Sequence, residues 1–248
     1  MKTSLLSAVL ILSIVCPLTT LSQAYDDMVL VEGNSEIESF YIDKYELTVR
    51  EFKKFVDDTG YVTVAEKNGG GYQYDFDNSN DLIIAEGHFY DYRYYVNKYD
   101  AFAESRNVGR LPANNLCPID AYAYARWAGK RLLTYEEWLY AAKGGKKSQN
   151  FTYSGSNKAK EVAWYEKNSG NLPNEVGKLK PNELGIYDMS GNLLEIVEFE
   201  NGEKKVYRLM GGDYGRGTFY LEYQNYGTLL KDNVPMYFIG FRFAKDAQ

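Results

Sequence analysis

The sequence predicts an α+β domain with much irregular loop structure. Helix signals fall within the first 145 residues, whereas from residue 146 onward turn dipeptides separate short segments. No alternation of strands with helices and no internal repeat is visible in the 248 residues. Helices early and short strands late favour an α+β fold over a parallel α/β sheet. The late turn dipeptides include Ser154-Gly155, Ser190-Gly191 and Gly211-Gly212.

The first predicted elements are a strand and a helix. Residues 36–48 alternate between apolar and polar side chains and contain aromatics, which is typical of a strand. Thr48 and Glu51 have the spacing of a capping box, which predicts a helix start. Four apolar residues that follow share one face of this helix, and Gly60 ends it. They are Val49, Phe52, Phe55 and Val56.

Two further helices are predicted in the middle of the chain. Pro118 suits the first turn of a helix, which Gly129 then ends. Thr134 and Glu137 form the capping box of the next helix, and Gly144-Gly145 stop it.

Strands and loops account for the rest. Residues 68–75 predict a turn that leads into an aromatic strand. Residues 76–115 have no helical period and predict a long irregular excursion, which is usually functional or peripheral. Near the C-terminus, residues 201–212 and 236–244 predict strands.

The N-terminus predicts export. Lys2 precedes an apolar run over residues 5–16, and the following polar stretch ends in Ser22-Gln23-Ala24. This pattern is typical of a secretory signal peptide, residues 1–24, cleaved after Ala24. Val15 is not the small residue that a lipid-attachment site at Cys16 prefers, so we expect release into the periplasm or the extracellular space. No later stretch reaches membrane-spanning length.

The net charge and the small numbers of histidines and cysteines limit the kinds of site that the chain can form. The net charge is −6 without a basic block, which argues against a nucleic-acid partner. His88 is the only histidine, which excludes most sites that need several imidazoles. After cleavage Cys117 is the only cysteine, and we expect a buried thiol rather than a reactive one.

Tyrosine is unusually frequent, with 24 residues. Tyrosine suits binding surfaces because it combines a large apolar ring with a hydroxyl and loses little entropy when ordered. The alternative is that these rings fill the space beside glycine-rich backbone. One candidate surface is the 76–100 loop, with Tyr90, Tyr92, Tyr94 and Tyr95.

Six segments in the same order resemble the formylglycine-generating enzyme family, also called the sulfatase-modifying factor family. Together they cover most of residues 36–244. The resemblance implies a C-type-lectin-like core with long loops, in one domain over residues 25–248. The segments are YIDKYELTVREFKKFVDDTGYVT (41–63), AYAYARWAGKRLLTYEEWLYAAKGG (121–145), AWYEKNSG (163–170), VGKLKPNELGIYDMSGNLLE (176–195), RLMGGDY (208–214) and GFRFA (240–244).

The resemblance also implies a structural calcium site. Its ligands would be the side chains of Asp188 and Glu195 and the carbonyl oxygens of Gly191 and Leu193. Calcium takes six to eight oxygen ligands, and a glycine turn allows carbonyl oxygens to converge. The alternative is a polar turn that holds no metal.

The same resemblance argues against oxidase chemistry. Family enzymes hold copper and the substrate thiol with two cysteines that follow a Gly-Gly pair. Here Gly211-Gly212 match that pair, and the two cysteine positions fall at Arg216 and Leu221. Neither side chain can ligate copper, because Cu(I) prefers sulfur. We therefore expect no copper and no catalytic residue of the family type.

The sequence thus predicts a secreted non-oxidase protein that binds a protein, peptide or glycan ligand through tyrosine-rich loops. The second candidate surface is residues 213–227, where the family's substrate groove would lie. Its composition is also typical of stretches diversified by retroelements. The alternative is an enzyme with an altered, copper-independent catalytic apparatus. The predicted ligand-binding residues are Tyr214, Arg216, Tyr220, Tyr223 and Tyr226.

Overall fold

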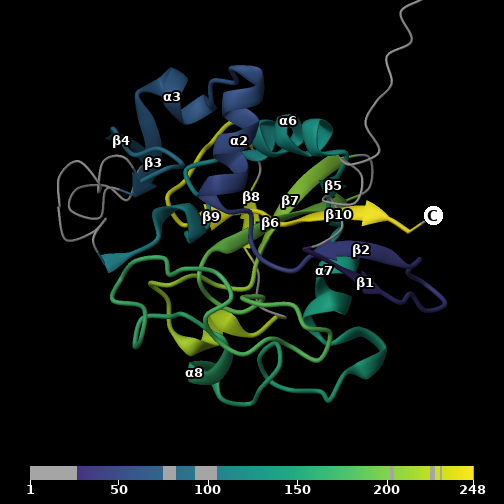
Figure 1. The fold of residues 1–248 in the computed structure, drawn as a ribbon. Coiled ribbons are helices and arrows are strands. Elements are labelled where there is room, and N and C mark those ends of the chain that lie inside the picture. The colour runs from purple at the N-terminus through teal and green to yellow at the C-terminus, as the bar shows by residue number, and fades with distance from the viewer. Residues whose placement is uncertain are drawn as a thin grey trace, which may run out of the picture.

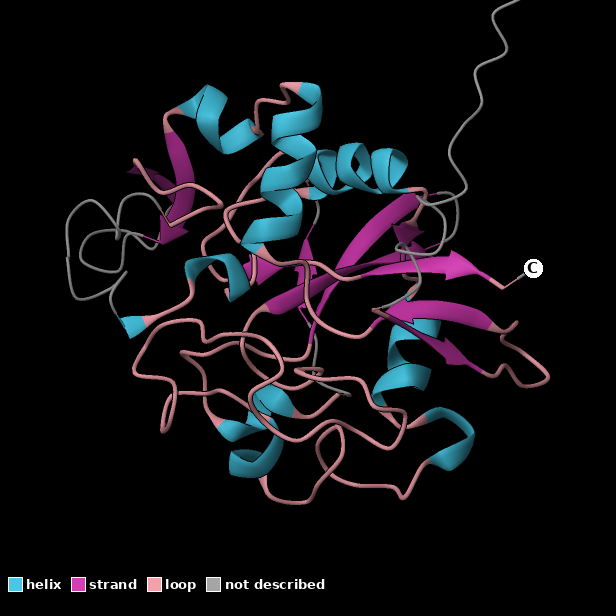
Figure 2. Cartoon of the chain, viewed as in Figure 1, coloured by secondary structure: helices cyan, strands magenta, loops and turns pink. Residues whose placement is uncertain are grey.

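The computed structural model describes residues 27–74, 82–92, 105–201, 204–223, 227–229 and 231–247. The predicted signal peptide, Tyr94, Tyr95 and Tyr226 lie outside these ranges. Two four-stranded sheets lie at the centre, with α2 and α6 on one side and a loop-rich region around α8 on the other (Figure 1). Loops make up much of the described chain (Figure 2), so the predicted α+β fold with extensive irregular structure is confirmed.

The first sheet joins strands from the two ends of the described chain. Its order is β1-β2-β10-β5, and all three pairings are antiparallel. Ile42 on β2 lies opposite Ala244 on β10. The predicted strand over 36–48 is shorter than expected. The strands are β1 (Met28–Val31), β2 (Phe40–Asp43), β5 (Arg131–Leu132) and β10 (Phe243–Asp246).

The second sheet has the order β8-β7-β6-β9. The long β6–β7 hairpin is antiparallel from Glu195↔Met210 to Asn201↔Lys204, whereas β9 pairs with β6 in parallel. β6 follows directly on the loop that carries the predicted calcium ligands. The strands are β6 (Leu194–Asn201), β7 (Lys204–Met210), β8 (Gly227–Leu229) and β9 (Ile239–Gly240).

All three predicted helices are present. α2 (Val49–Thr59) begins with the Thr48–Glu51 capping box and ends at Gly60, whose φ is +68°. α6 (Pro118–Ala128) ends at Gly129, and α7 (Tyr135–Ala142) begins at Thr134 and ends one residue earlier than predicted. The shorter helices are α3 (Val64–Asn68), α8 (Ala159–Val162), η1 (Val108–Arg110), η2 (Gly145–Lys147) and η3 (Thr218–Leu221).

The predicted irregular excursion needs two corrections. It contains a strand, β4 (Leu82–Glu86), which pairs with β3 (Gly70–Tyr74) as an antiparallel hairpin. Tyr90 and Tyr92 are buried, so the prediction that they present a binding surface is wrong. The Tyr90 ring packs 4.8 Å from the Phe52 ring, and the Tyr92 hydroxyl donates to the Pro112 carbonyl (2.8 Å). These two rings fill the core.

Burial also accounts for the lone cysteine. Cys117 is fully buried and donates its thiol to Asp120 (3.2 Å). Burial, reinforced by the Asp120 charge, raises the pKa of this thiol, so it is not a nucleophile at neutral pH. No helix within the described parts of the chain is both long and apolar enough to cross a bilayer.

Candidate functional site

The loop before β6 has a backbone that few residues could adopt. Gly191 has φ +80°, and Asp188 and Asn192 also have positive φ, which Asp and Asn tolerate better than most residues. A Cβ on Gly191 would lie 2.2 Å from the Trp164 carbonyl oxygen. The chain can pass Trp164 at this distance only because residue 191 is glycine.

A buried carboxylate holds the end of this loop. Glu46 accepts hydrogen bonds from the Asn192 amide side chain (2.6 Å) and from the Leu193 backbone N–H (2.9 Å). Burial, and then the nearby Asp188 and Glu195 carboxylates, raise the pKa of Glu46. Glu46 comes from the segment between β2 and α2, so it ties the loop to a distant part of the chain.

Glu195 lies at the centre of a buried ion pair with Arg242. The Arg242 Nη2 donates to Glu195 Oε1 (2.7 Å) and Nε donates to Oε2 (2.8 Å). The Trp138 indole N–H also donates to Oε2 (2.6 Å). Arg242 and Glu195 expose 0% and 1% of their side chains. Further Arg242 donors bind the carbonyls of Asp43 and Tyr187, so one guanidinium joins four segments.

This arrangement disagrees with the predicted calcium role of Glu195. Both of its oxygens already accept hydrogen bonds from Arg242 or Trp138, which leaves little capacity to close a metal site. No group of three or more metal-ligating His, Cys, Asp or Glu side chains occurs within the described ranges. Arg242 already neutralises the charge of Glu195.

Asp188 fits a cation better. Its Oδ2 accepts the Gly177 N–H (2.7 Å), but its buried Oδ1 has no hydrogen-bond partner among the described residues. Burial raises the pKa of Asp188 to about 6. A buried carboxylate oxygen without a partner is costly, and a bound cation or water would satisfy it. Calcium held by Asp188 with the carbonyls of Gly191 and Leu193 therefore stays a prediction, without Glu195.

The adjacent loop, residues 213–223, carries the positions that the family uses for copper. The Arg216 Nε donates to the buried Asp213 carboxylate (2.8 Å), and its guanidinium lies 5.0 Å from the centre of the Tyr220 ring. Leu221 is fully buried against Ala159, Ala163 and Tyr165. An ion-paired guanidinium and a buried leucine offer no ligand for a soft metal.

The predicted tyrosines differ in what they present. Tyr220 is 46% exposed and lies at the surface. Tyr214 is buried, and the Tyr223 hydroxyl donates to the Phe151 carbonyl, so both serve mainly in packing. The sequence reasoning missed Phe219, which is 64% exposed and meets the Tyr220 ring edge-to-face at 5.4 Å. The sequence signal was a pair of adjacent aromatics in the segment Gly217-Thr218-Phe219-Tyr220.

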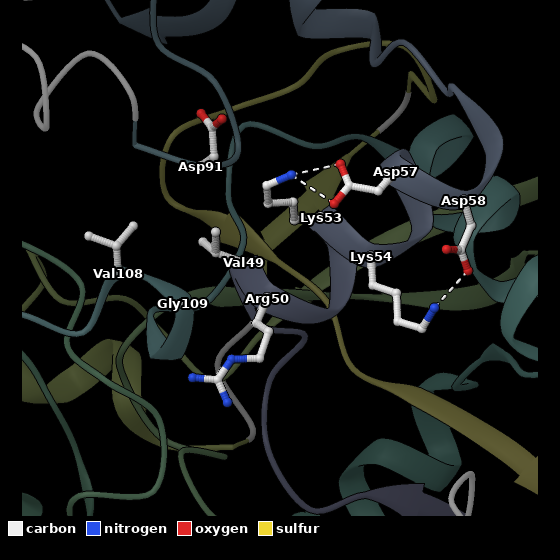
Figure 3. A pocket seen from close by; sticks show the side chains of 9 residues that line it. All are labelled: Val49, Arg50, Lys53, Lys54, Asp57, Asp58, Asp91, Val108 and Gly109. Atoms are coloured by element: carbon white, nitrogen blue, oxygen red, sulfur yellow. Dashed lines mark hydrogen bonds and ion pairs between the residues drawn. The ribbon is translucent and has the colours of Figure 1, made fainter.

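A cavity lies away from both site loops. Its volume is about 710 Å³, and it runs along one face of α2, where the pairs Lys53–Asp57 and Lys54–Asp58 line it (Figure 3). No predicted site residue lines this cavity. The other lining residues are Val49, Arg50, Asp91, Val108 and Gly109.

A loop-rich α+β domain, with its first and last described strands in one sheet and a site loop that leads into the second sheet, has the C-type-lectin-like fold. The family described as "Sulfatase-modifying factor enzyme 1-like domain" matches residues 20–247, and the chain belongs to this family. The resemblance seen in the sequence is thereby confirmed.

Relatives within the family have different activities. "Chaperone protein LppX" of Paenibacillus barcinonensis is 33% identical over 210 residues, 68% of this chain and 70% of the relative. "Formylglycine-generating enzyme" of Bos taurus is 29% identical over 64% of this chain, which spans about half (48%) of that enzyme. "Inactive C-alpha-formylglycine-generating enzyme 2" of Mus musculus is 27% identical over 64% of this chain and 58% of its own length.

Solved structures share the fold. PvdO from Pseudomonas aeruginosa has a TM-score of 0.63 and 22% identity, over 85% of this chain and 81% of PvdO. CarF has a TM-score of 0.62 and 21% identity, over 90% of this chain and 98% of CarF. At these identities the likeness concerns the fold alone.

Proposed function

We propose that this protein is an exported, non-oxidase member of the family that binds unfolded or extended polypeptides through loop 213–223. The observation that carries the proposal concerns Arg216 and Leu221, which occupy the two positions where family enzymes have copper-binding cysteines. Arg216 is ion-paired with Asp213 and Leu221 is buried, so this loop has no thiol to react. A related protein named as inactive supports a non-enzymatic use of the scaffold.

Polypeptide is the ligand class that the surface favours among protein, peptide and glycan. Phe219 and Tyr220 present adjacent exposed rings, with the Arg216 guanidinium beside them. Aromatic and arginine side chains are the usual anchors of polypeptide interfaces. A related protein named as a chaperone points in the same direction.

The test is binding of reduced, carboxymethylated α-lactalbumin, which stays unfolded in buffer. The double variant Phe219→Ala/Tyr220→Ala should bind about tenfold more weakly or worse, because losing ~1.4 kcal/mol of contact energy has that effect. Leu30→Ala is the matched control. Leu30 is also a large apolar side chain and, like Tyr220, is 46% exposed, but it lies on β1. Equal binding by wild type and the double variant would contradict the proposal.

A second assay addresses the rival function. A copper-independent enzyme of this family would consume a substrate, and a cysteine-bearing peptide with dissolved oxygen is the first one to try. We expect no loss of peptide thiol above a protein-free control, with or without added copper. Thiol consumption that follows protein concentration would replace the binding proposal with an enzymatic one.

Calcium enters the proposal as a structural ion beside Asp188. It would neutralise the buried carboxylate whose Oδ1 has no partner among the described residues, and so stabilise the fold by mass action. Millimolar calcium should raise the melting temperature of chelated wild type and leave Asp188→Asn unchanged. An equal response of the two proteins would place any calcium effect elsewhere.

A further inference from the structure

The hairpin strand β4 carries an unusual apolar surface. Leu82, Ile83 and Ile84 expose 39%, 39% and 42% of their surfaces, although neighbours in a strand point to opposite faces. Both faces of this strand are therefore open to solvent at the same place. Figure 1 shows β3 and β4 at the periphery, away from the two four-stranded sheets.

The backbone edge of β4 that faces away from β3 is the second feature of this hairpin. Tyr72 lies opposite Ile84 in the hairpin, yet the Tyr72 N–H donates to the Pro235 carbonyl on the side away from β4 (2.6 Å). Tyr72 and Ile84 are thus a non-hydrogen-bonded pair, and the N–H and C=O of Ile84 point to the outer edge. No described strand pairs with that edge.

Exposed edge strands usually carry protection. Lysine, proline or a bulge normally prevents an edge from adding a further strand. β4 reads LIIAE, without lysine or proline, and its five pairs with β3 run in continuous register without a bulge. Its one charge, Glu86, is exposed and makes no ion pair with another described residue.

We propose that the outer edge of β4 is a second polypeptide-docking site, which adds an extended apolar segment as a third strand of the β3–β4 sheet. The proposal rests on the proposed function and specifies how a bound polypeptide is held. Backbone hydrogen bonds to Ile84 supply affinity, and the aliphatic side chains select apolar residues. Glu86 at the strand end favours a segment with a basic residue opposite it.

A second copy of the protein is a poorer occupant than a peptide. A stable protein–protein interface buries about 800 Å² on each partner. Three aliphatic side chains that expose about two fifths of their surfaces fall well short of that area. A short peptide can bind such an edge because most of its contacts are backbone hydrogen bonds.

The probe is a fluorescein-labelled heptapeptide of alternating valine and threonine with a terminal lysine. Wild type should bind it, and a version methylated at alternate backbone nitrogens should bind about tenfold more weakly or worse, since it cannot donate to the edge. This comparison uses the unaltered protein, so misfolding cannot explain the result. Equal binding of the two peptides would overturn the proposal.

The variant Ile84→Pro removes an N–H that points outward and breaks no β3–β4 bond. It should weaken binding of the lysine-ended peptide as strongly as peptide methylation does, whereas Ile84→Thr, which keeps the N–H, should retain most of it. Retained binding by Ile84→Pro with an unchanged melt would also overturn the proposal. A concentration-dependent dimer of the protein alone, lost in Ile84→Pro, would identify a second copy as the occupant instead.

Failure of this inference differs from failure of the proposed function. If wild type binds neither the heptapeptide nor unfolded α-lactalbumin, the proposed function fails. If α-lactalbumin binds wild type and Ile84→Pro equally, and the Phe219/Tyr220 variant reduces that binding, the function stands and the β4 site is wrong.

Discussion

The loop of residues 188–195 and the loop of residues 213–223 are neighbours that differ in their contacts. The first makes buried polar contacts, and the second exposes aromatic rings. They touch directly, since the Tyr214 N–H donates to the Asn192 carbonyl and the Ser190 hydroxyl donates to the Leu221 carbonyl. The first loop turns the Glu195 carboxylate inward to Arg242 and the Asn192 amide inward to Glu46. The second leaves Phe219 and Tyr220 in solvent. Buried polar contacts hold the first loop in place, whereas the second loop exposes two aromatic rings that no such contact needs.

The largest expected effect comes from breaking the ion pair beneath the first loop. Arg242→Met should lower the free energy of unfolding by about 3–5 kcal/mol, because it leaves Glu195 charged and buried without its ionic partner. Chemical denaturation measures this. The control Lys54→Ala breaks an exposed pair with Asp58 and should cost less than about 1 kcal/mol. Similar losses for the two variants would contradict a structural role of Arg242.

A smaller loss should follow from the backbone of the first loop. Gly191→Ala combines a positive φ with a Cβ 2.2 Å from the Trp164 carbonyl oxygen, so we expect a loss of about 2–4 kcal/mol. Gly60→Ala is the matched control, since φ is +68° there but no atom lies within 4 Å of the new Cβ. Only the conformational cost, about 1–2 kcal/mol, should remain in that variant. Equal losses of unfolding free energy in the two variants would show that the Trp164 backbone moves to accommodate the new Cβ.

The two loops also differ in how well the sequence predicts them. Capping boxes and glycines define α2, α6 and α7 locally, so a short window of sequence suffices for these helices. The partners of Glu195 could not be found that way. Arg242 is 47 residues away and Trp138 is 57, and no local pattern shows that they meet.

The burial of individual tyrosines also could not be predicted from the sequence. Tyrosine composition does not distinguish Tyr92, which is 2% exposed, from Tyr220, which is 46% exposed. Both lie in loop-like sequence rich in tyrosine. Their difference depends on which long-range segment covers them, which is decided by tertiary packing.

The charge of Asp188 makes the stability of the first loop depend on pH. Its folded pKa is about 6 and the ordinary value is 3.8, so between these values the folded state binds more protons than the unfolded state. Stability contributed by this group is therefore present below about pH 4 and is lost as pH rises to about 6. Asp188→Asn in EDTA should melt higher than wild type at pH 7.5, and this advantage should shrink toward pH 4. An advantage that does not change with pH would rule out the carboxylate charge as its cause.

The smallest effect on stability should come from the second loop. Phe219 and Tyr220 are 64% and 46% exposed, so replacing both by alanine removes little buried apolar area and should change the free energy of unfolding by no more than about 0.5 kcal/mol. The same double variant is expected to lose polypeptide binding. Denaturation and binding should therefore be measured on one preparation of each variant. Arg242→Met should have a lower free energy of unfolding, whereas Phe219→Ala/Tyr220→Ala should lose only its affinity for polypeptide. A double variant that unfolds as readily as Arg242→Met would show that the exposed rings also hold the fold, and the contrast between the loops would not stand.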